Sequence, residues 1–182
     1  IALSIIQRSH DMAYRDELTR LPGRRALEEA LMELGRCYVI AMVDVDHFKR
    51  FNDRYGHSIG DDVLRLGAAR MRSTGGGGRA YRYGGEEFAV LFRRRTIKDV
   101  LPHLEDLRQT ISNYRLTIRG SGRPQRRRKG RRLRTTDTGQ GGVSVTVSIG
   151  VAARNDRYGT PGDVLKAADK ALYRAKRKGR NQ

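Results

Sequence analysis

A short segment in which two glycines and two acids interrupt an apolar pattern places the strongest constraint on the fold. Residues 82–91 are Arg-Tyr-Gly-Gly-Glu-Glu-Phe-Ala-Val-Leu, with aromatic and apolar residues on both sides of Gly84 and Gly85. Paired glycines accept the positive φ angles of a tight two-residue turn, so the segment predicts an antiparallel hairpin. Because successive strand side chains point to opposite faces, only one of Glu86 and Glu87 can face a given pocket.

A second acidic segment lies upstream, at the end of a predicted buried strand. The apolar run from Cys37 to Val43 is followed directly by Asp44, Val45 and Asp46. In open α/β sheets ligands bind just beyond strand ends, and oxygen ligands there suit Mg²⁺ carrying a nucleotide phosphate. Taken alone, the same pattern is equally typical of two aspartates that cap a following helix.

The residues that follow extend this pattern into a long motif. Residues 44–64 are Asp-Val-Asp-His-Phe-Lys-Arg-Phe-Asn-Asp-Arg-Tyr-Gly-His-Ser-Ile-Gly-Asp-Asp-Val-Leu, and the Gly-Gly-Glu-Glu-Phe hairpin comes next. The combination resembles the GGDEF domains, diguanylate cyclases that condense two GTP molecules into cyclic di-GMP. The family pattern DxDxFKxxNDxxGHxxGDxxL is matched at every fixed position. The resemblance runs from Asp16 to Asn181, although Gly23 replaces the asparagine usual in the entry segment.

The resemblance implies a fold of the nucleotide cyclase and polymerase palm type. This is an α/β architecture with a mixed central sheet flanked by helices, which also follows from helix-connected strands beside a hairpin. The periodicities predict helices at about 24–35, 60–73, 97–113 and 161–178, and strands at about 37–44, 79–83, 86–93 and 143–153, with a weak strand near 115–119. Residues 16–182 are expected to form the GGDEF domain, and residues 1–15 the end of a signalling helix from a sensory domain upstream.

The resemblance also implies two-metal phosphoryl transfer. The 3′-hydroxyl of one GTP attacks the α-phosphate of another, while two Mg²⁺ ions, with Mn²⁺ as an alternative, neutralise the phosphates. By resemblance Asp44 and Glu86 bridge the ions, and Val45 contributes its main-chain carbonyl. Glu86 is also the expected proton acceptor. Glu87 is a candidate partial ligand, and Asp46 a weaker candidate.

Guanine recognition needs acceptors that match its ring N–H and amino groups. By resemblance Asn52 and Asp61 supply this recognition. His57 is expected close to the nucleotide, or else stabilises the turn. Phe48 is either a wall of the guanine pocket or a buried aromatic anchor.

Three cations are expected to hold the phosphates. Lys49 follows the acidic strand end and is expected to stabilise the transition state, whereas Lys176 and Arg180 hold the β- and γ-phosphates by resemblance. The latter two are spaced i,i+4, so they share a helix face while that turn stays helical. Alone, such a cluster would be a solvated helix end favoured by the helix dipole.

One departure from the family concerns regulation. Many relatives carry an RxxD motif just before the signature, through which cyclic di-GMP inhibits the enzyme. Residues 75–78 at this place are four glycines. We therefore expect no feedback inhibition through such a site.

The net charge of +18 is concentrated in one insertion. Nine Lys or Arg and no acid lie between Arg119 and Arg134, within a polar Gly- and Arg-rich segment at about 119–142. Charge alone could attract nucleic acid or another acidic surface. The segment lacks aromatic residues that stack on bases, which favours a solvated loop without a specific ligand.

Composition limits the remaining classes. The sequence contains no run long enough to cross a bilayer and only one cysteine, Cys37, expected as a small buried hydrophobe. Both indicate a cytoplasmic domain, although a full-length protein could be membrane-attached. Because the product needs two GTP molecules facing each other, catalysis implies a homodimer. A catalytically silent GGDEF module that binds GTP or cyclic di-GMP and signals through a partner is the main alternative, and a basic nucleic-acid adaptor is a third.

Overall fold

The structure, a computed structural model, describes residues 14–117 and 142–182. Most of the predicted signalling helix, residues 1–13, and nearly all of the basic insertion lie outside these residues. The elements in chain order are α2 (Arg24–Met32), β1 (Tyr38–Val45), α3 (Phe48–Tyr55), α4 (His57–Arg72), β2 (Arg79–Arg82), β3 (Glu87–Arg93), α5 (Ile97–Asn113), β4 (Leu116–Thr117), β5 (Gly142–Val143), β6 (Val147–Ala153) and α6 (Pro161–Arg177). Among the described residues, no helix is both long and apolar enough to span a membrane.

The main sheet has four strands in the order β2-β3-β1-β6. The α/β class with helices around a central sheet is confirmed, but each strand pairing in this sheet is antiparallel, so the expectation of a mixed sheet is wrong. Strands β1 and β2 do run parallel, as helix-connected strands should. They are not neighbours, because the hairpin places β3 between them.

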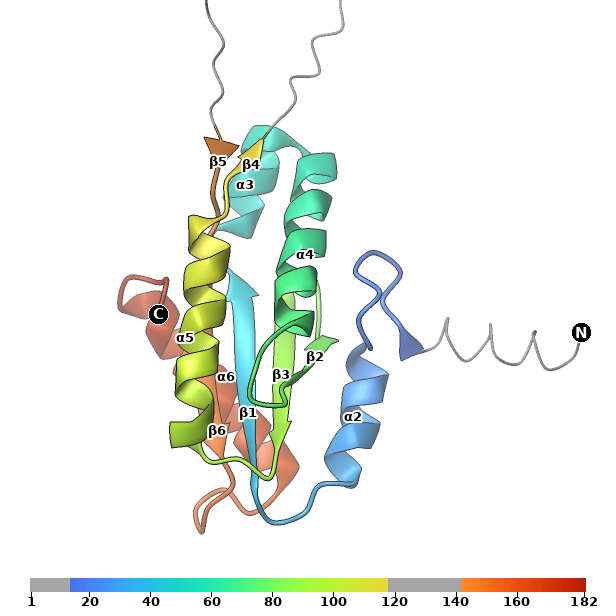
Figure 1. The fold of residues 1–182 in the computed structure, drawn as a ribbon, viewed down its shortest axis with the longest axis vertical. Coiled ribbons are helices and arrows are strands. Elements are labelled where there is room, and N and C mark those ends of the chain that lie inside the picture. Colours follow the sequence, from blue (N-terminus) through green and yellow to red (C-terminus); the bar gives the residue numbers. More distant parts are fainter. Residues whose placement is uncertain (1–13, 118–141) are drawn as a thin grey trace, which may run out of the picture.

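Two apolar layers enclose the sheet (Figure 1). Alternate residues of β1 enter opposite clusters: Val39 and Val43 join the side chains of α4 and α5, whereas Ile40 and Met42 join those of α2 and α6. All eight residues of β1 are buried, as expected for a central strand covered on both faces. The acidic end of β1 therefore opens at an edge of a rigid core.

Helix α3 was not expected from the sequence, and α4 begins before the predicted residue 60. The apolar residues of α3, Phe48 and Phe51, are buried in the same cluster as the apolar residues of α4. The two helices are separated by Gly56, whose φ of 86° lies in the region that favours glycine. Polar residues outnumber apolar ones in α3, which hid its helical period.

The glycine-rich hairpin forms, but with a longer turn than the sequence predicts. Pairing stops at Arg82 and Phe88, and the N–H groups of Tyr83 and Gly84 both donate to the Glu87 carbonyl. Neither Gly84 nor Gly85 has a φ in the left-handed region, so the predicted two-residue turn is wrong.

A partly buried arginine, Arg82, holds this turn in place. The Arg82 guanidinium donates to the carbonyls of Gly84 and Gly85 and forms an ion pair with Asp16 at 3.3 Å. Burial lowers the pKa of Arg82, while Asp16 and Asp61 act in the opposite direction. The turn is thus held by side-chain hydrogen bonds in place of strained glycines.

Cys37 is exposed, which corrects the expectation of a small buried hydrophobe. The strand begins one residue later, at Tyr38, so Cys37 precedes the part of the chain that the helices cover. Its thiol donates to the Arg95 carbonyl at 3.5 Å.

Helix α6 packs so closely on β6 that Gly150 has no room for a side chain. A Cβ at Gly150 would lie 2.0 Å from the backbone nitrogen of Leu172 and 2.2 Å from the Ala168 carbonyl oxygen. We expect Gly150→Ala to lower the free energy of unfolding by about 3 kcal/mol, because backbone on both sides must shift. Chemical denaturation checks this, with Gly159→Ala as the control, since nothing lies within 4 Å of a Cβ there. Equal stability of the two variants would contradict the close packing.

Candidate active site

The acidic end of β1 opens into a cavity of about 260 Å³. Its walls come from the end of β1, the start of α3, the residue before β3 and the C-terminal end of α6. The lining residues are Asp44, Val45, His47, Phe48, Lys49, Arg50, Glu86, Lys176 and Arg180. Segments far apart in the sequence therefore place two carboxylates and four cations around one small space.

Asp44 is the most buried ionisable group of this cavity. Its side chain is 4% exposed and lies 2.7 Å from the Nζ atom of Lys176. Burial raises the pKa of Asp44 to about 6; Lys176 lowers it, whereas Glu86 and Glu87 raise it further. Burial therefore disfavours the ionised form of Asp44, and the neighbouring Lys176 favours it.

The side chains of Glu86 and Glu87 lie in different places, as the alternation of side chains along a strand requires. The Val45 N–H donates to the Glu86 carbonyl at 3.3 Å, and the Glu86 side chain lines the cavity beside Asp44. Glu87 lies opposite Asp44 in the β1–β3 register but does not line the cavity. A Cβ at Gly84 would lie 3.2 Å from Oε2 of Glu87, so this carboxylate lies against the turn.

The first turn of α3 supplies the opposite wall. Phe48 is 8% exposed, packs in the core as a buried aromatic anchor and also lines the cavity. Lys49 is exposed and reaches the same cavity.

Arg180 reaches the cavity from a turn, not from the predicted helix face. Helix α6 ends at Arg177, and Gly179 and Arg180 have φ angles of 120° and 65°. The turn is not helical at Arg180, so the condition under which Lys176 and Arg180 would share a helix face is not met, although both line the cavity.

Asp46 anchors the turn that carries Arg180. It accepts hydrogen bonds from the hydroxyls of Thr146 and Ser148, both at 2.7 Å, and from the Asn181 N–H at 3.1 Å. The side chain is 5% exposed, and these three donors occupy both of its oxygens. Asp46 therefore holds the C-terminal segment against β6, in agreement with its low ranking as a metal ligand.

The predicted guanine-binding residues lie next to one another but outside this cavity. The Asn52 side chain lies against Gly60, where a Cβ would be 1.8 Å from its Oδ1 atom. That Oδ1 atom is buried and has no hydrogen-bond partner among the described residues. Asp61 follows Gly60 and is partly buried, whereas His57 is exposed at the start of α4. An unpartnered buried acceptor beside a carboxylate suits a ligand with N–H donors.

Two residues of the cavity were not found from the sequence. His47 precedes α3 with a φ of 56°, and Arg50 lies in the first turn of that helix. Only a recognised start of α3 would have signalled them, because the first turn directs its residues at the strand end.

The oxygen donors of the cavity suit a hard divalent cation. Asp44, Val45 and Glu86 line the same cavity. Within 14–117 and 142–182, no group of three or more His, Cys, Asp or Glu side chains is suited to a metal. Mg²⁺ commonly takes one or two carboxylates and fills its other positions with water and substrate phosphate oxygens. The donor set therefore fits a metal that binds together with a nucleotide.

Comparison with known proteins identifies the family. The family profile described as "Diguanylate cyclase, GGDEF domain" matches residues 13–128 and 126–182. The chain belongs to the GGDEF family. It is 34% identical to the response regulator PleD of Caulobacter vibrioides over 97% of this chain and 37% of that protein. It is 36% identical to the diguanylate cyclase VdcA of Vibrio cholerae over 92% of this chain and 45% of that protein.

Solved GGDEF structures share the fold. The coiled coil and GGDEF domain of DgcB from Caulobacter crescentus, in complex with c-di-GMP, superposes with a TM-score of 0.83 at 31% identity, covering 100% of this chain and 90% of that one. The diguanylate cyclase SiaD of Pseudomonas aeruginosa, in complex with its activator SiaC, gives 0.76 at 34% identity over 99% of this chain and 64% of that one. The cyclase and palm-type fold is thereby confirmed. The chain spans less than half the length of the relatives PleD and VdcA.

Proposed function

We propose that this chain is a diguanylate cyclase domain that condenses two GTP molecules into cyclic di-GMP and pyrophosphate. The observation that carries the proposal is the convergence of Asp44, Glu86, Lys176 and Arg180 on one cavity. Carboxylates that hold divalent ions, next to cations that hold phosphates, are what phosphoryl transfer from a nucleotide requires. Family membership and the cyclase relatives support the same reaction.

In this proposal each residue of the cavity has a separate role. Lys176 and Arg180 bind the β- and γ-phosphates, and Lys49 stabilises charge that develops at the α-phosphate. Two bound Mg²⁺ or Mn²⁺ ions would supply charge neutralisation and activation of the attacking hydroxyl, held by Asp44, Glu86 and the Val45 carbonyl. Glu87 is proposed as a partial ligand.

Recognition of guanine is proposed for the neighbouring residues of α3 and α4. The unpartnered Oδ1 of Asn52 accepts from guanine, and the Asp61 carboxylate takes the remaining donors. His57 lies at the edge of this site, and Phe48 forms a wall between base and phosphates. One domain then holds one GTP, so the reaction needs two domains facing each other, brought together by an upstream sensory segment.

The direct test is product analysis after incubation of concentrated protein with GTP and Mg²⁺. We expect cyclic di-GMP, at a rate that rises more steeply than linearly with protein concentration, because two domains must meet. Fusion to a parallel dimeric coiled coil should remove that concentration dependence. GTP binding without product, even in the fused dimer, would reject the cyclase and indicate a nucleotide-binding module.

We also expect cyclic di-GMP to inhibit only by competition with GTP. The four glycines at 75–78 offer no charged side chain, and Cβ atoms at Gly75 and Gly76 would lie 2.6 Å and 2.5 Å from the His103 ring. Initial rates at several GTP concentrations should show an unchanged maximal rate with added product. A lowered maximal rate, or product bound beside Gly75 in a crystal, would contradict this expectation.

A further inference from the structure

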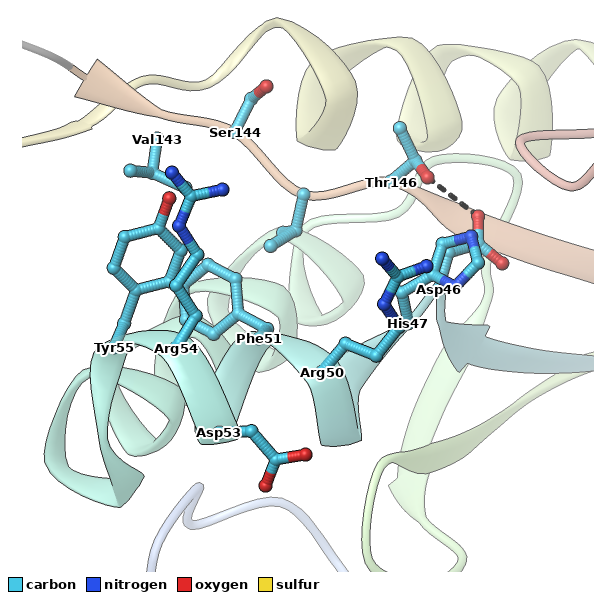
Figure 2. A pocket seen from close by; sticks show the side chains of 11 residues that line it. Asp46, His47, Arg50, Phe51, Asp53, Arg54, Tyr55, Val143, Ser144 and Thr146 are labelled. Carbon is cyan, nitrogen blue, oxygen red and sulfur yellow. Dashed lines mark hydrogen bonds between the residues drawn. The ribbon is translucent and has the colours of Figure 1, made fainter.

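A groove beside the candidate active site is larger than the active-site cavity itself. It has a volume of about 620 Å³ and lies between α3 and the segment that joins β5 to β6. Figure 2 shows His47, Arg50, Arg54 and Tyr55 on one side of this groove and residues 143–146 on the other. Its volume lies within the range of small-molecule sites. We call it the α3 groove.

The α3 groove is lined by two arginines, Arg50 and Arg54, and by two carboxylates, Asp46 and Asp53. Arg50 and Arg54 are exposed, lie four residues apart on α3, and form no ion pair with any described residue. Asp46 is committed to its three hydrogen bonds, and the Asp53 carboxylate points away from the β5–β6 segment in Figure 2. Two exposed arginines that form no ion pair among the described residues favour an anionic ligand.

A stacking surface lies at the far end of the groove. The Arg54 guanidinium lies 5.1 Å from the centroid of the Tyr55 ring. Tyr55 is supported in turn by Phe51, with ring centroids 4.8 Å apart and planes at 47°. Guanidinium and aromatic faces of this kind stack on nucleobases. The groove thus combines base-stacking groups at one end with phosphate-binding groups at the other.

We propose that the α3 groove is a second nucleotide site, which binds a nucleoside polyphosphate with its base at Arg54 and Tyr55 and its phosphates at Arg50. His47 and Arg50 line both the groove and the catalytic cavity. The phosphates of a nucleotide in the groove would therefore lie next to those of the GTP in the catalytic cavity. The ligand is either free nucleotide or GTP held by a facing domain.

The test is equilibrium binding of a fluorescent α,β-methylene GTP analogue, which cannot react. We expect two nucleotides per chain, and we expect Arg54→Gln to weaken one of them about 10-fold through loss of a charge-assisted contact. Arg54 does not line the catalytic cavity, so the other affinity should stay unchanged. Arg25→Gln is the matched control, an exposed arginine on α2. Circular dichroism checks that both variants fold.

Protein concentration distinguishes the two sources of nucleotide. Second-site binding in dilute, monomeric protein identifies free nucleotide, whereas second-site binding that appears only in the dimer identifies the GTP of a facing domain. One nucleotide per chain at both concentrations, with Arg54→Gln equal to Arg25→Gln, would overturn the proposal even if the protein makes cyclic di-GMP. Inorganic tripolyphosphate that competes as well as the nucleotide would overturn the base-stacking assignment. If single-stranded RNA binds in an Arg54-dependent way and no second mononucleotide binds, the proposal of a mononucleotide site is overturned in favour of a nucleic-acid site.

Discussion

Cyclic di-GMP formation should fall by about a hundredfold to a thousandfold in Glu86→Gln, the variant that removes one charge from the cavity and keeps the side chain's shape. Glu86 and Asp44 are the two carboxylates that line the catalytic cavity. With Glu86 neutral, the proposed metal bridge loses charge and the attacking hydroxyl loses its proton acceptor. Product formation under saturating GTP and Mg²⁺ measures the effect.

A surface carboxylate provides the control for this substitution. Asp62 lies on α4, is exposed, and pairs with Arg65 at 2.8 Å outside the cavity. Asp62→Asn should leave product formation within about twofold of the wild type, because exposed ion pairs contribute little. Retention of activity in Glu86→Gln, or an equal loss in both variants, would remove the support for Glu86 as a metal ligand.

Asp44→Asn should stop catalysis and yet stabilise the metal-free protein at neutral pH. The buried carboxyl has a pKa of about 6 against an ordinary value of 3.8, so the fold disfavours its ionised form. Between these values the folded state binds more protons than the unfolded state, and stability falls as the pH rises. The loss of stability caused by ionisation of Asp44 is absent below about pH 4 and complete above about pH 6. Its size is roughly 1 to 3 kcal/mol, from 1.36 kcal/mol per pKa unit.

Thermal unfolding in EDTA at several pH values measures this effect. The stability gain of Asp44→Asn should be present at pH 7 to 8 and shrink toward pH 4. Asp46→Asn is the matched comparison two residues along, and it should destabilise the protein because Asp46 accepts three hydrogen bonds. If Asp44→Asn lowers stability at pH 8 as much as Asp46→Asn does, Asp44 is a structural carboxylate and not a strained ligand.

Features that depend on neighbouring residues could be predicted from the sequence. Alternation placed Glu86 and Glu87 on opposite faces, and the apolar run before Asp44 predicted a buried strand with an acidic end. Helical periodicity located α5 and α6 closely. The motif spacing also predicted the family, which the profile match confirmed.

Predictions from local sequence patterns were wrong where a contact with a residue distant in the sequence decides the local structure. The glycine pair predicted a two-residue turn, but Arg82 holds a longer one through hydrogen bonds to its carbonyls. The few apolar residues of α3 become a helix face only when α4 and the sheet cover them. Cys37 was assigned to the core because its neighbours are apolar, although the covering layers begin at the next residue.

By itself the sequence determined which chemical groups the protein contains and which of them share a face of a strand or a helix. The sharing of a face follows from backbone periods of only a few residues. Only the tertiary structure decided which groups meet. Antiparallel register sets Glu86 beside Val45, and Asp46 ties the C-terminal turn so that Arg180 faces the cavity. The α3 groove likewise forms only where the segment between β5 and β6 lies opposite α3, because a groove depends on distances between segments far apart in the chain.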